Sequence, residues 1–490
     1  MTKLYKLSLK ETLENLSKRE ISSLELINCY IERINTLDKY NLVSEKLYED
    51  ALILAKKSDS KKKSERLVLE GIPIAAKDIF CTKNNKTTAS SNILNGFISP
   101  YESTVTNNLK KSGAIILCKT TMDEFAMGSA SDTCNLGKVI NPWTTDFEKP
   151  FTPGGSSGGS AGIIAASGAC FSLGTDTGGS IRQPAAFCGV VGLKPTYGTC
   201  SRYGMIAFAS SLDQAGPITR NVEDAAYALS NMASYDEKDS TSSKKEVPNL
   251  FNKLKNGVKG LKIGIPKEYN IEGISSEIKE LWDKGKEILS SQGAEIIEIS
   301  LPHSRFALPT YYIIAPAEAS ANLSRYDGVK YGYRSKKEFK DLNDMYCKTR
   351  GEGFGKEVKR RLLIGTYVLS SGYYDAYYIH AQKVRKKIIE DFNLSFKTVD
   401  LILTPTAPSD AFMIGEKNDD PISMYLNDIF TVPSSLAGLP AISIPAGLSS
   451  NNKPLGLQLI ANSFREDLLV QSAYLLEQEV KFKHKPKIDS

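Results

Sequence analysis

Histidine is scarce in this chain, which has three histidines among 490 residues. They are His303, His380 and His484, which stand in a turn, after a tyrosine-rich stretch and in a basic tail. A serine hydrolase of the usual kind needs a histidine base, so this scarcity argues against a Ser-His-Asp triad. No Cys-x-x-Cys occurs and no Cys/His pair has the spacing of zinc ligands, so we expect no metal site.

Long apolar runs are missing as well, because none reaches the roughly 18 residues of a membrane span. The N-terminus lacks the apolar core of a signal peptide, and Glu11, Glu14 and Glu20 argue against an organelle transit peptide. The eight cysteines are scattered singly, which fits a reducing compartment better than a disulfide framework. We therefore expect a cytoplasmic protein without membrane segments.

The chain is neither strongly basic nor equipped with a phosphate-binding motif. Its net charge is only +6, from 62 basic and 56 acidic residues, whereas nucleic-acid binders concentrate their basic residues on one face. The densest group of lysines, in residues 56–63, is interpreted as a solvated linker, with an RNA-binding patch as the alternative. The P-loop and the G-x-G-x-x-G motif are both absent. Any use of ATP would therefore belong to a partner.

The apolar content, 41% of the residues, is that of a large folded core. Two capping boxes and apolar residues at helical spacing predict helices within residues 8–37. Residues 261–299 have a strand–helix–strand pattern, which is typical of a parallel or mixed sheet. We predict an α/β fold with a mixed central β-sheet flanked by helices. An N-terminal helical segment, 1–65, would pack on one large domain, 66–480, with a polar surface excursion at 235–257.

A serine in a glycine-rich turn is the first candidate for catalysis. Residues 154–158, Gly-Gly-Ser-Ser-Gly, formally match the G-x-S-x-G nucleophile elbow and place Ser156 at its centre. Because no histidine is suitably placed, another base is needed, and a lysine can serve when burial lowers its pKa. Lys77 ends the apolar run 72–76, where it would be desolvated. The alternative interpretation is a lysine that extends from a strand end into solvent.

A second glycine-rich loop carries Ser180, 24 residues after Ser156. Residues 174–182 read Gly-Thr-Asp-Thr-Gly-Gly-Ser-Ile-Arg, between a strand-like run and a predicted helix start. This arrangement aims successive backbone N–H groups at one point, which would form an oxyanion hole. Gly178 and Gly179 leave room there for a substrate carbonyl. The alternative is a structural glycine turn with a capping serine.

Together these features resemble the amidase-signature family of enzymes. The resemblance is carried by residues 153–160 (Pro-Gly-Gly-Ser-Ser-Gly-Gly-Ser), 174–182 and 189–196 (Gly-Val-Val-Gly-Leu-Lys-Pro-Thr). It implies a single amidase-signature domain with a Lys-Ser-Ser triad. In that triad Ser180 is the nucleophile, Ser156, in a cis-peptide setting, relays its proton, and Lys77 is the base. The oxyanion would be held by backbone N–H groups of Thr177, Gly178, Gly179 and Ser180.

Later blocks extend the resemblance over nearly the whole chain and narrow it to the glutaminase subunits of glutamyl-tRNA(Gln) amidotransferases. The blocks that separate these subunits from free-standing amidases are 201–204, 210–214, 216–220, 322–328, 353–361, 370–377 and 424–428. The resemblance implies that the chain hydrolyses glutamine and supplies ammonia, without a cofactor of its own. A B subunit would use ATP and Mg to amidate mischarged Glu-tRNA(Gln), or in some cases Asp-tRNA(Asn). A small C subunit would complete the heterotrimer.

Free glutamine carries an α-carboxylate and an α-ammonium, which a guanidinium and a carboxylate would bind. The resemblance implies Arg361 for the carboxylate, Asp428 for the ammonium and Tyr312 as a wall of the pocket. The neighbours Arg360 and Tyr311 are alternatives, and an Arg-Arg pair on a charged helix is otherwise a solvated face. Two other functions stay open: a free-standing amidase acting on small amides, and a binding scaffold that has lost catalysis.

Overall fold

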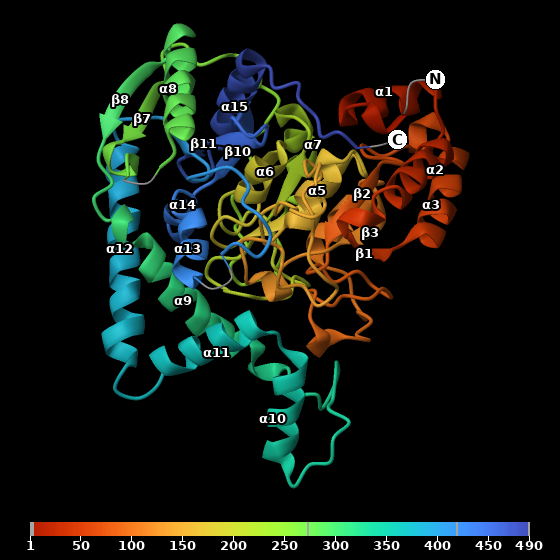
Figure 1. The fold of residues 1–490 in the computed structure, drawn as a ribbon. Helices are drawn as coiled ribbons and strands as arrows, with labels where there is room; N and C mark the ends of the chain where they lie inside the picture. The colour runs from red at the N-terminus through yellow and green to blue at the C-terminus, as the bar shows by residue number, and fades with distance from the viewer. Residues whose placement is uncertain (1–3, 272–273, 418–419, 489–490) are drawn as a thin grey trace.

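The chain folds around one mixed β-sheet of eleven strands, as shown by a computed structural model that describes residues 4–271, 274–417 and 420–488 (Figure 1). The strands lie in the order β1-β3-β2-β4-β6-β5-β10-β11-β9-β7-β8. Their bounds are Val43–Lys46 (β1), Pro73–Lys77 (β2), Ile115–Thr120 (β3), Phe171–Asp176 (β4), Val191–Lys194 (β5), Gln214–Thr219 (β6), Lys262–Pro266 (β7), Glu295–Ile299 (β8), Leu401–Pro405 (β9), Ala441–Leu448 (β10) and Pro454–Ala461 (β11). The α/β class and the mixed sheet are thus confirmed.

Parallel pairing is confined to two parts of the sheet. β2 runs parallel to β3 and β4 on one side, and β7 runs parallel to β8 and β9 on the other. The remaining pairs are antiparallel, including the hairpin of β10 and β11. Every residue of β2, β3 and β4 is buried, which requires cover on both faces of the sheet.

Helices provide this cover. Their bounds are Leu9–Lys18 (α1), Ser23–Asn35 (α2), Tyr48–Ser60 (α3), Thr104–Lys111 (α4), Gly158–Ala165 (α5), Arg182–Cys188 (α6), Val222–Met232 (α7), Ser276–Ser291 (α8), Ala307–Asn322 (α9), Leu342–Gly353 (α10), Lys356–Val368 (α11), His380–Ser395 (α12), Pro421–Tyr425 (α13), Val432–Leu436 (α14) and Glu466–Val480 (α15). α5 packs on β4, whereas α6 and α15 pack on the β10–β11 hairpin. α10 projects away from the sheet at the bottom of Figure 1. None of the described helices is long and apolar enough to cross a membrane.

Several local predictions are confirmed and one is wrong. Both capping boxes are present: the Ser8 hydroxyl accepts from the Glu11 N–H, and the Ser22 hydroxyl accepts from the Glu25 N–H, each at 3.1 Å. The strand–helix–strand unit is β7-α8-β8, with its two strands parallel. The lysine-rich residues 56–63 are not a linker, because α3 continues to residue 60 and a short 3₁₀ turn follows. The buried apolar face of α3 keeps this segment helical.

The polar stretch at 235–257 contains neither helix nor strand, but it is attached to the fold. Asp239 is 6% exposed and forms a 2.9 Å ion pair with Arg202. Leu250 and Leu254 in the same stretch are buried in the core. The description of this stretch as an excursion and the boundary near residue 65 both stay predictions.

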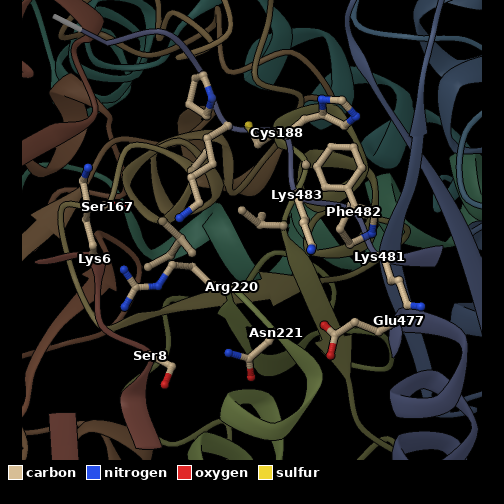
Figure 2. Close-up of a pocket in the computed structure, with 18 of the residues that line it drawn as sticks. Lys6, Ser8, Ser167, Cys188, Arg220, Asn221, Glu477, Lys481, Phe482 and Lys483 are labelled. Carbon is tan, nitrogen blue, oxygen red and sulfur yellow. The ribbon is translucent and has the colours of Figure 1, made fainter. Parts of the chain in front are cut away.

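Residues near both ends of the described chain, among them Lys6, Ser8 and residues 481–486, line a cavity of about 390 Å³ (Figure 2). Arg220, which follows β6, lines this cavity and donates hydrogen bonds to the carbonyl oxygens of Tyr5, at 2.6 Å, and Leu7. From the C-terminal side, Phe482 packs against Trp143 with ring centroids 6.3 Å apart. Arg220 thus links the N-terminal segment to the sheet through hydrogen bonds. None of the predicted site residues lines this cavity.

Candidate active site

Lys77 is the last residue of β2, and its side chain is completely buried. Its Nζ lies 2.8 Å from each of three hydroxyl oxygens, those of Ser156, Ser157 and Thr175. The two serines precede α5, and Thr175 belongs to β4, the strand beside β2 in the sheet. The lysine therefore lies between the two glycine-rich segments and does not extend into solvent.

Burial lowers the pKa of Lys77 to about 7, because the ammonium form loses its hydration inside the protein. The carboxylates of Asp123, Asp176 and Asp213 favour the ammonium and oppose part of this shift. Near neutral pH a large share of the molecules therefore carries a neutral amine at this position. A neutral amine can accept a proton from a neighbouring hydroxyl.

The loop before α5 presents Ser156 to this amine. The Gly155–Ser156 peptide bond is cis, as the family resemblance implied. Asp123 holds the loop: its N–H donates to the Ser156 carbonyl oxygen at 3.2 Å, and its carboxylate accepts from the Ser131 N–H and the Thr133 hydroxyl at 2.9 Å. Burial raises the pKa of Asp123, and these donors oppose the rise.

Ser180 stands in the turn between β4 and α6, with 8% of its surface exposed. Its carbonyl oxygen accepts a hydrogen bond from the Ser157 N–H at 3.2 Å, which ties the two glycine-rich loops together. Its hydroxyl makes no hydrogen bond within residues 4–271, 274–417 and 420–488, so it is free to meet a substrate. The structure thus joins Lys77 to Ser156 directly and brings Ser180 to the pair through the backbone.

A buried ion pair holds the turn that carries Ser180. Arg182 and Asp176 are both 0% exposed, and two nitrogens of the guanidinium each lie 2.9 Å from a carboxylate oxygen. Arg182 also donates to the hydroxyls of Ser434 and Ser435 at 2.7 Å. Burial alone would raise the pKa of Asp176, but Arg182 reverses this effect and the pKa lies below its usual value. The carboxylate therefore stays charged and fixes the turn.

The backbone N–H groups of residues 177–180 donate no hydrogen bond to the part of the chain that the structure describes. Unpaired N–H groups in a buried turn are rare, and here they are available to a developing negative charge. A Cβ on Gly178 would lie 2.9 Å from the ring of Tyr311. One on Gly179 would lie 2.8 Å from Asp428 Oδ1. Only glycine fits at either position, and the arrangement suits the predicted oxyanion hole.

Asp428 faces this turn, and only one of its two carboxylate oxygens accepts a hydrogen bond from the described residues. One oxygen accepts a hydrogen bond from the Ser129 hydroxyl at 2.5 Å. The other, Oδ1, is buried and has no partner among the described residues. Burial raises the pKa of Asp428 to about 7. An unpaired buried oxygen is costly, and an incoming ammonium group would satisfy it.

The two neighbouring arginines of α11 occupy different environments. Arg361 is 3% exposed, and its Nε donates to Glu357 at 2.8 Å. Its guanidinium lies 5.4 to 5.7 Å from three ring centroids, those of Phe208, Tyr312 and Tyr425. Arg360 binds the same glutamate at 2.8 Å, with 35% of its side chain exposed. Both arginines line a nearby cavity, so the choice of Arg361 as the carboxylate ligand stays a prediction, for which its burial among aromatic rings is the argument.

The two neighbouring tyrosines of α9 both border the site. Tyr312 stacks on Tyr425 with ring centroids 3.7 Å apart, on the side of Arg361. Tyr311 meets Tyr312 edge to face at 5.0 Å and lies against Gly178. Neither tyrosine lines the cavity beside the site, so the role of Tyr312 as a wall of the glutamine pocket stays a prediction, whereas Tyr311 lies against the glycine turn.

A cavity of about 440 Å³ opens beside these groups, with Ser129, Glu357, Arg361 and Tyr425 on its wall. Asp132 also lines it, and burial raises the pKa of this carboxyl to about 6. No group of three or more His, Cys, Asp or Glu side chains that could hold a metal ion occurs in the described segments. The cavity thus offers hydrogen-bonding and charged groups for a small polar molecule.

Three contacts of the site have no clear signal in the sequence. Ser157 and Thr175 complete the shell of hydroxyls around Lys77, and Ser129 holds Asp428. The Ser-Ser pair at 156–157 indicated the segment that contacts Lys77, but not which of its hydroxyls makes the contact. Ser129 lies far from Asp428 in the sequence, so only the folded chain reveals the pair.

Comparison with known proteins places the chain in a family. A family model described as Amidase matches residues 25–470. The A subunit of the glutamyl-tRNA(Gln) amidotransferase of Pelagibacter ubique (strain HTCC1062) is 57% identical, over 99% of each chain. The crystal structure of the corresponding A subunit from Thermotoga maritima is 38% identical, with a TM-score of 0.82, over 100% of this chain and 99% of that one. The peptide amidase from Stenotrophomonas maltophilia is similar in fold, with a TM-score of 0.80 over 99% of each chain, but only 27% identical. The fold alone does not distinguish an A subunit from a peptide amidase, because the TM-scores are similar, whereas the sequence identity over the full length does. The chain therefore belongs to the amidase family and, within it, to the A subunits of glutamyl-tRNA(Gln) amidotransferases.

Proposed function

We propose that the chain is the glutaminase of a glutamyl-tRNA(Gln) amidotransferase, which hydrolyses glutamine through a serine acyl-enzyme and supplies ammonia to a partner. The observation that carries this proposal is the 2.8 Å contact between Lys77 Nζ and Ser156 Oγ, two fully buried side chains. A lysine with a pKa of about 7 is a competent base at neutral pH. The name of the relatives supports transfer of an amide group to glutamyl-tRNA(Gln).

In the first half-reaction Ser180 Oγ attacks the carboxamide carbon of glutamine. Ser156 Oγ accepts the proton of Ser180 and passes its own to Lys77 Nζ. The carbonyl oxygen becomes an oxyanion, which the N–H groups of Thr177, Gly178, Gly179 and Ser180 stabilise. The C–N bond then breaks, the proton returns through Ser156 to the leaving nitrogen, and ammonia departs.

In the second half-reaction water attacks the γ-glutamyl ester of Ser180. The same relay takes a proton from the water and returns one to Ser180 Oγ as the ester bond breaks. Glutamate leaves and the free serine is restored. The relay needs no histidine, which agrees with the small number of histidines in the chain.

Three side chains hold the glutamine. Arg361 binds the α-carboxylate, and Oδ1 of Asp428 binds the α-ammonium, for which its missing partner among the described residues leaves it available. Tyr312 forms the wall between them. The ammonium would also lower the pKa of Asp428 and keep it ionised while the substrate is bound.

The ammonia goes to a B subunit, which uses ATP and Mg to amidate mischarged Glu-tRNA(Gln), and a small C subunit completes the complex. This chain has no cofactor of its own. The relatives' designation as one subunit of an amidotransferase supports such an assembly. The eight free cysteines support a place in the reducing cytoplasm.

The deciding experiment measures ammonia release from glutamine by the chain alone and with the B and C subunits, ATP and Glu-tRNA(Gln). Ser180→Ala serves as the control. We expect release that requires Ser180 and increases with the partners. Release that partners do not change, and that extends to other small amides, would instead support a free-standing amidase. No release from the complete mixture would support a scaffold without catalysis.

A further inference from the structure

Glu124 is a buried carboxylate to which the proposed reaction gives no part. It begins a short turn, Glu124–Ala126, after β3, and only 2% of its surface is exposed. Its two oxygens lie 2.9 and 3.1 Å from the backbone nitrogen of Gly355 and accept its N–H. One of them also accepts a hydrogen bond from the hydroxyl of Ser91. A carboxylate is costly to bury unless such donors satisfy it, so these contacts fix its position.

The contact with Gly355 lies at the start of α11, which packs on α9 away from the sheet (Figure 1). Gly355 precedes the helix and has no side chain with which to cap it. Glu124 supplies the missing acceptor and places its charge at the positive end of the helix dipole. A Cβ on Gly355 would collide with this carboxylate. The glycine therefore leaves room for a cap that comes from a distant part of the chain.

The segment that joins α10 to α11 is held by the same turn. Phe354 is 3% exposed, and its ring meets that of Phe125 edge to face, with centroids 5.7 Å apart. The Ser91 hydroxyl that contacts Glu124 also lies 3.4 Å from the carbonyl oxygen of Gly353. Adjacent residues of one turn therefore fix the chain on both sides of the point where α11 begins.

The residue before Glu124 holds the opposite wall of the cavity beside the site. This cavity of about 440 Å³ is lined by residues of the segment 128–133 and by the first turns of α11. Asp123 accepts hydrogen bonds from the Ser131 N–H and the Thr133 hydroxyl, each at 2.9 Å. The Glu124 N–H donates to the same hydroxyl at 3.2 Å. Residues 123–126 therefore connect the two walls.

The turn has a backbone shape that its surroundings must enforce. Phe125 and Ala126 are both buried and both left-handed, with φ of 50° and 60°. Residues that carry a Cβ adopt this conformation only where other contacts require it. Here the Phe125 N–H donates to the Ala89 carbonyl oxygen and the Ala126 N–H to that of Asp123, each at 3.0 Å. A turn held in this way keeps the two walls at a defined spacing.

We propose that Glu124 is a positioning residue for substrate binding, which holds the start of α11 and thereby fixes Arg361 relative to the other wall of the cavity. This inference rests on the proposed function, because it takes Arg361 as the ligand of the α-carboxylate. Arg361 lies about 9 Å along the helix from Gly355, at 1.5 Å per residue. Its partner Glu357, at 2.8 Å, belongs to the first turn of the helix. A shift of the helix start therefore moves the guanidinium.

The contact is strongest when Glu124 is ionised. Burial raises the pKa of this carboxyl to about 7, whereas the donors Ser91 and Gly355 and the nearby ammonium of Lys359 oppose the rise. Kinetics at pH 8.5 therefore examine the charged carboxylate. At this pH Lys77, with its pKa of about 7, is neutral as well.

The test compares KM and kcat for glutamine in the complete mixture with the B and C subunits, ATP and Glu-tRNA(Gln). Glu124→Met removes the acceptor, and we expect KM to rise by about tenfold while kcat stays within about threefold. Glu124→Gln keeps an acceptor for the Gly355 N–H and should recover most of the affinity. Gly355→Ala leaves Glu124 in place but forces its carboxylate away, so KM should rise by a smaller factor.

Glu466→Met is the matched control for the loss of a buried carboxylate. Glu466 is 0% exposed and accepts the Thr196 N–H at 2.8 Å, at the start of α15, which contributes nothing to the wall of this cavity. Its loss should lower the thermal midpoint, as the loss of Glu124 does, but leave KM unchanged. The thermal midpoint of every variant reports whether the fold persists.

A double variant shows whether Glu124 acts through Arg361. Glu124→Met combined with Arg361→Lys should have a KM close to that of Arg361→Lys alone, because the guanidinium to be positioned is already absent. A general loosening of the fold would add its own factor to KM. Full additivity of the two substitutions would therefore overturn this inference.

The other outcomes separate this inference from the proposed function. An unchanged KM in both Glu124→Met and Gly355→Ala would overturn the inference and leave the proposed function intact. The same holds for an equal rise in Glu466→Met, or for a KM in Glu124→Gln as high as in Glu124→Met. An unchanged KM in Arg361→Lys would overturn the inference together with the assignment of Arg361. Absence of glutamine hydrolysis by the unaltered chain in the complete mixture would overturn both the inference and the proposed function.

Discussion

Lys77 Nζ and Ser156 Oγ lie 2.8 Å apart, and neither side chain is exposed to solvent. Because a neutral amine is less costly to bury than an ammonium, the fold itself favours the neutral form of Lys77. If Lys77 is the base, as proposed, its reactivity depends on exclusion of water as much as on the choice of residues.

Removal of the proposed nucleophile or base should abolish catalysis while the fold persists. We expect Ser180→Ala and Lys77→Ala to lower kcat for glutamine hydrolysis by about 10⁴-fold or more, because the two residues act as one unit. The measurement is ammonia release at saturating glutamine, with exposed Ser450→Ala as the control. Substantial activity in either site variant would refute the assigned roles.

Activity should rise with pH through about 7 and then level off. Lys77 accepts a proton only as a neutral amine, and its pKa is lowered to about 7, so the active fraction is small at pH 5.5 and nearly complete at pH 9. The profile of kcat separates this effect from ionisation of Asp428, which changes KM. Lys77→Arg, which stays protonated, should be inactive throughout. A flat kcat profile would argue against lysine as the base.

The two arginines of α11 should differ sharply in their effect on substrate binding. Arg361→Lys loses the planar guanidinium inside the cavity, and we expect KM for glutamine to rise by about 10- to 100-fold. Arg360→Lys is the matched control, because its partly exposed side chain should tolerate the change. Steady-state kinetics on both variants decides the point, and equal effects would mean that the assignment to Arg361 is wrong.

A methyl group in the glycine turn should impair catalysis more than folding. The Cβ of Gly178→Ala would lie 2.9 Å from the Tyr311 ring, so the turn must shift its N–H groups. We expect kcat to fall by about 10²- to 10³-fold, with a smaller change in KM. The thermal midpoint reports whether the fold persists. Unaltered kcat would exclude this turn as the oxyanion hole.

The buried ion pair between Asp176 and Arg182, beside the turn that carries Ser180, should stabilise the fold. Asp176→Asn leaves the buried Arg182 without its countercharge, and we expect the free energy of unfolding to fall by about 3–5 kcal/mol. Urea denaturation measures the loss. The double variant Asp176→Leu with Arg182→Met removes both charges and should recover part of it. If the single and double variants are equally unstable, charge pairing is not the cause.

Much of the fold could be predicted because local patterns and tertiary packing agree. The helix caps at Ser8 and Ser22 and the parallel unit at 262–299 follow from side-chain spacing alone. The lysines of residues 56–63 are mostly exposed, as their charge predicted, but the segment is not a linker, because the opposite face of α3 packs on the core. The order of eleven strands depends on pairings far apart in the sequence, which no local pattern specifies.

The site could be predicted by residue type better than by contact. Lys77 and Ser156 were predicted from an apolar run and a glycine-rich turn, and the structure brings them together. The choice between Arg360 and Arg361 depends on how α11 is rotated on α9, which sequence spacing does not determine. Ser129 near Asp428 and Thr175 near Lys77 follow from the meeting of separate elements, so only the folded chain reveals them.

α11 holds Arg361 and Glu357 on one face and Leu363 and Tyr367 on the other. A rigid helix cannot turn one face without turning the opposite one. Two molecules that bound to the two faces of α11 would therefore influence each other's affinity by the same factor, because thermodynamic linkage is mutual. A substitution on the exposed face can in the same way change the position of Arg361 on the cavity wall without touching the cavity.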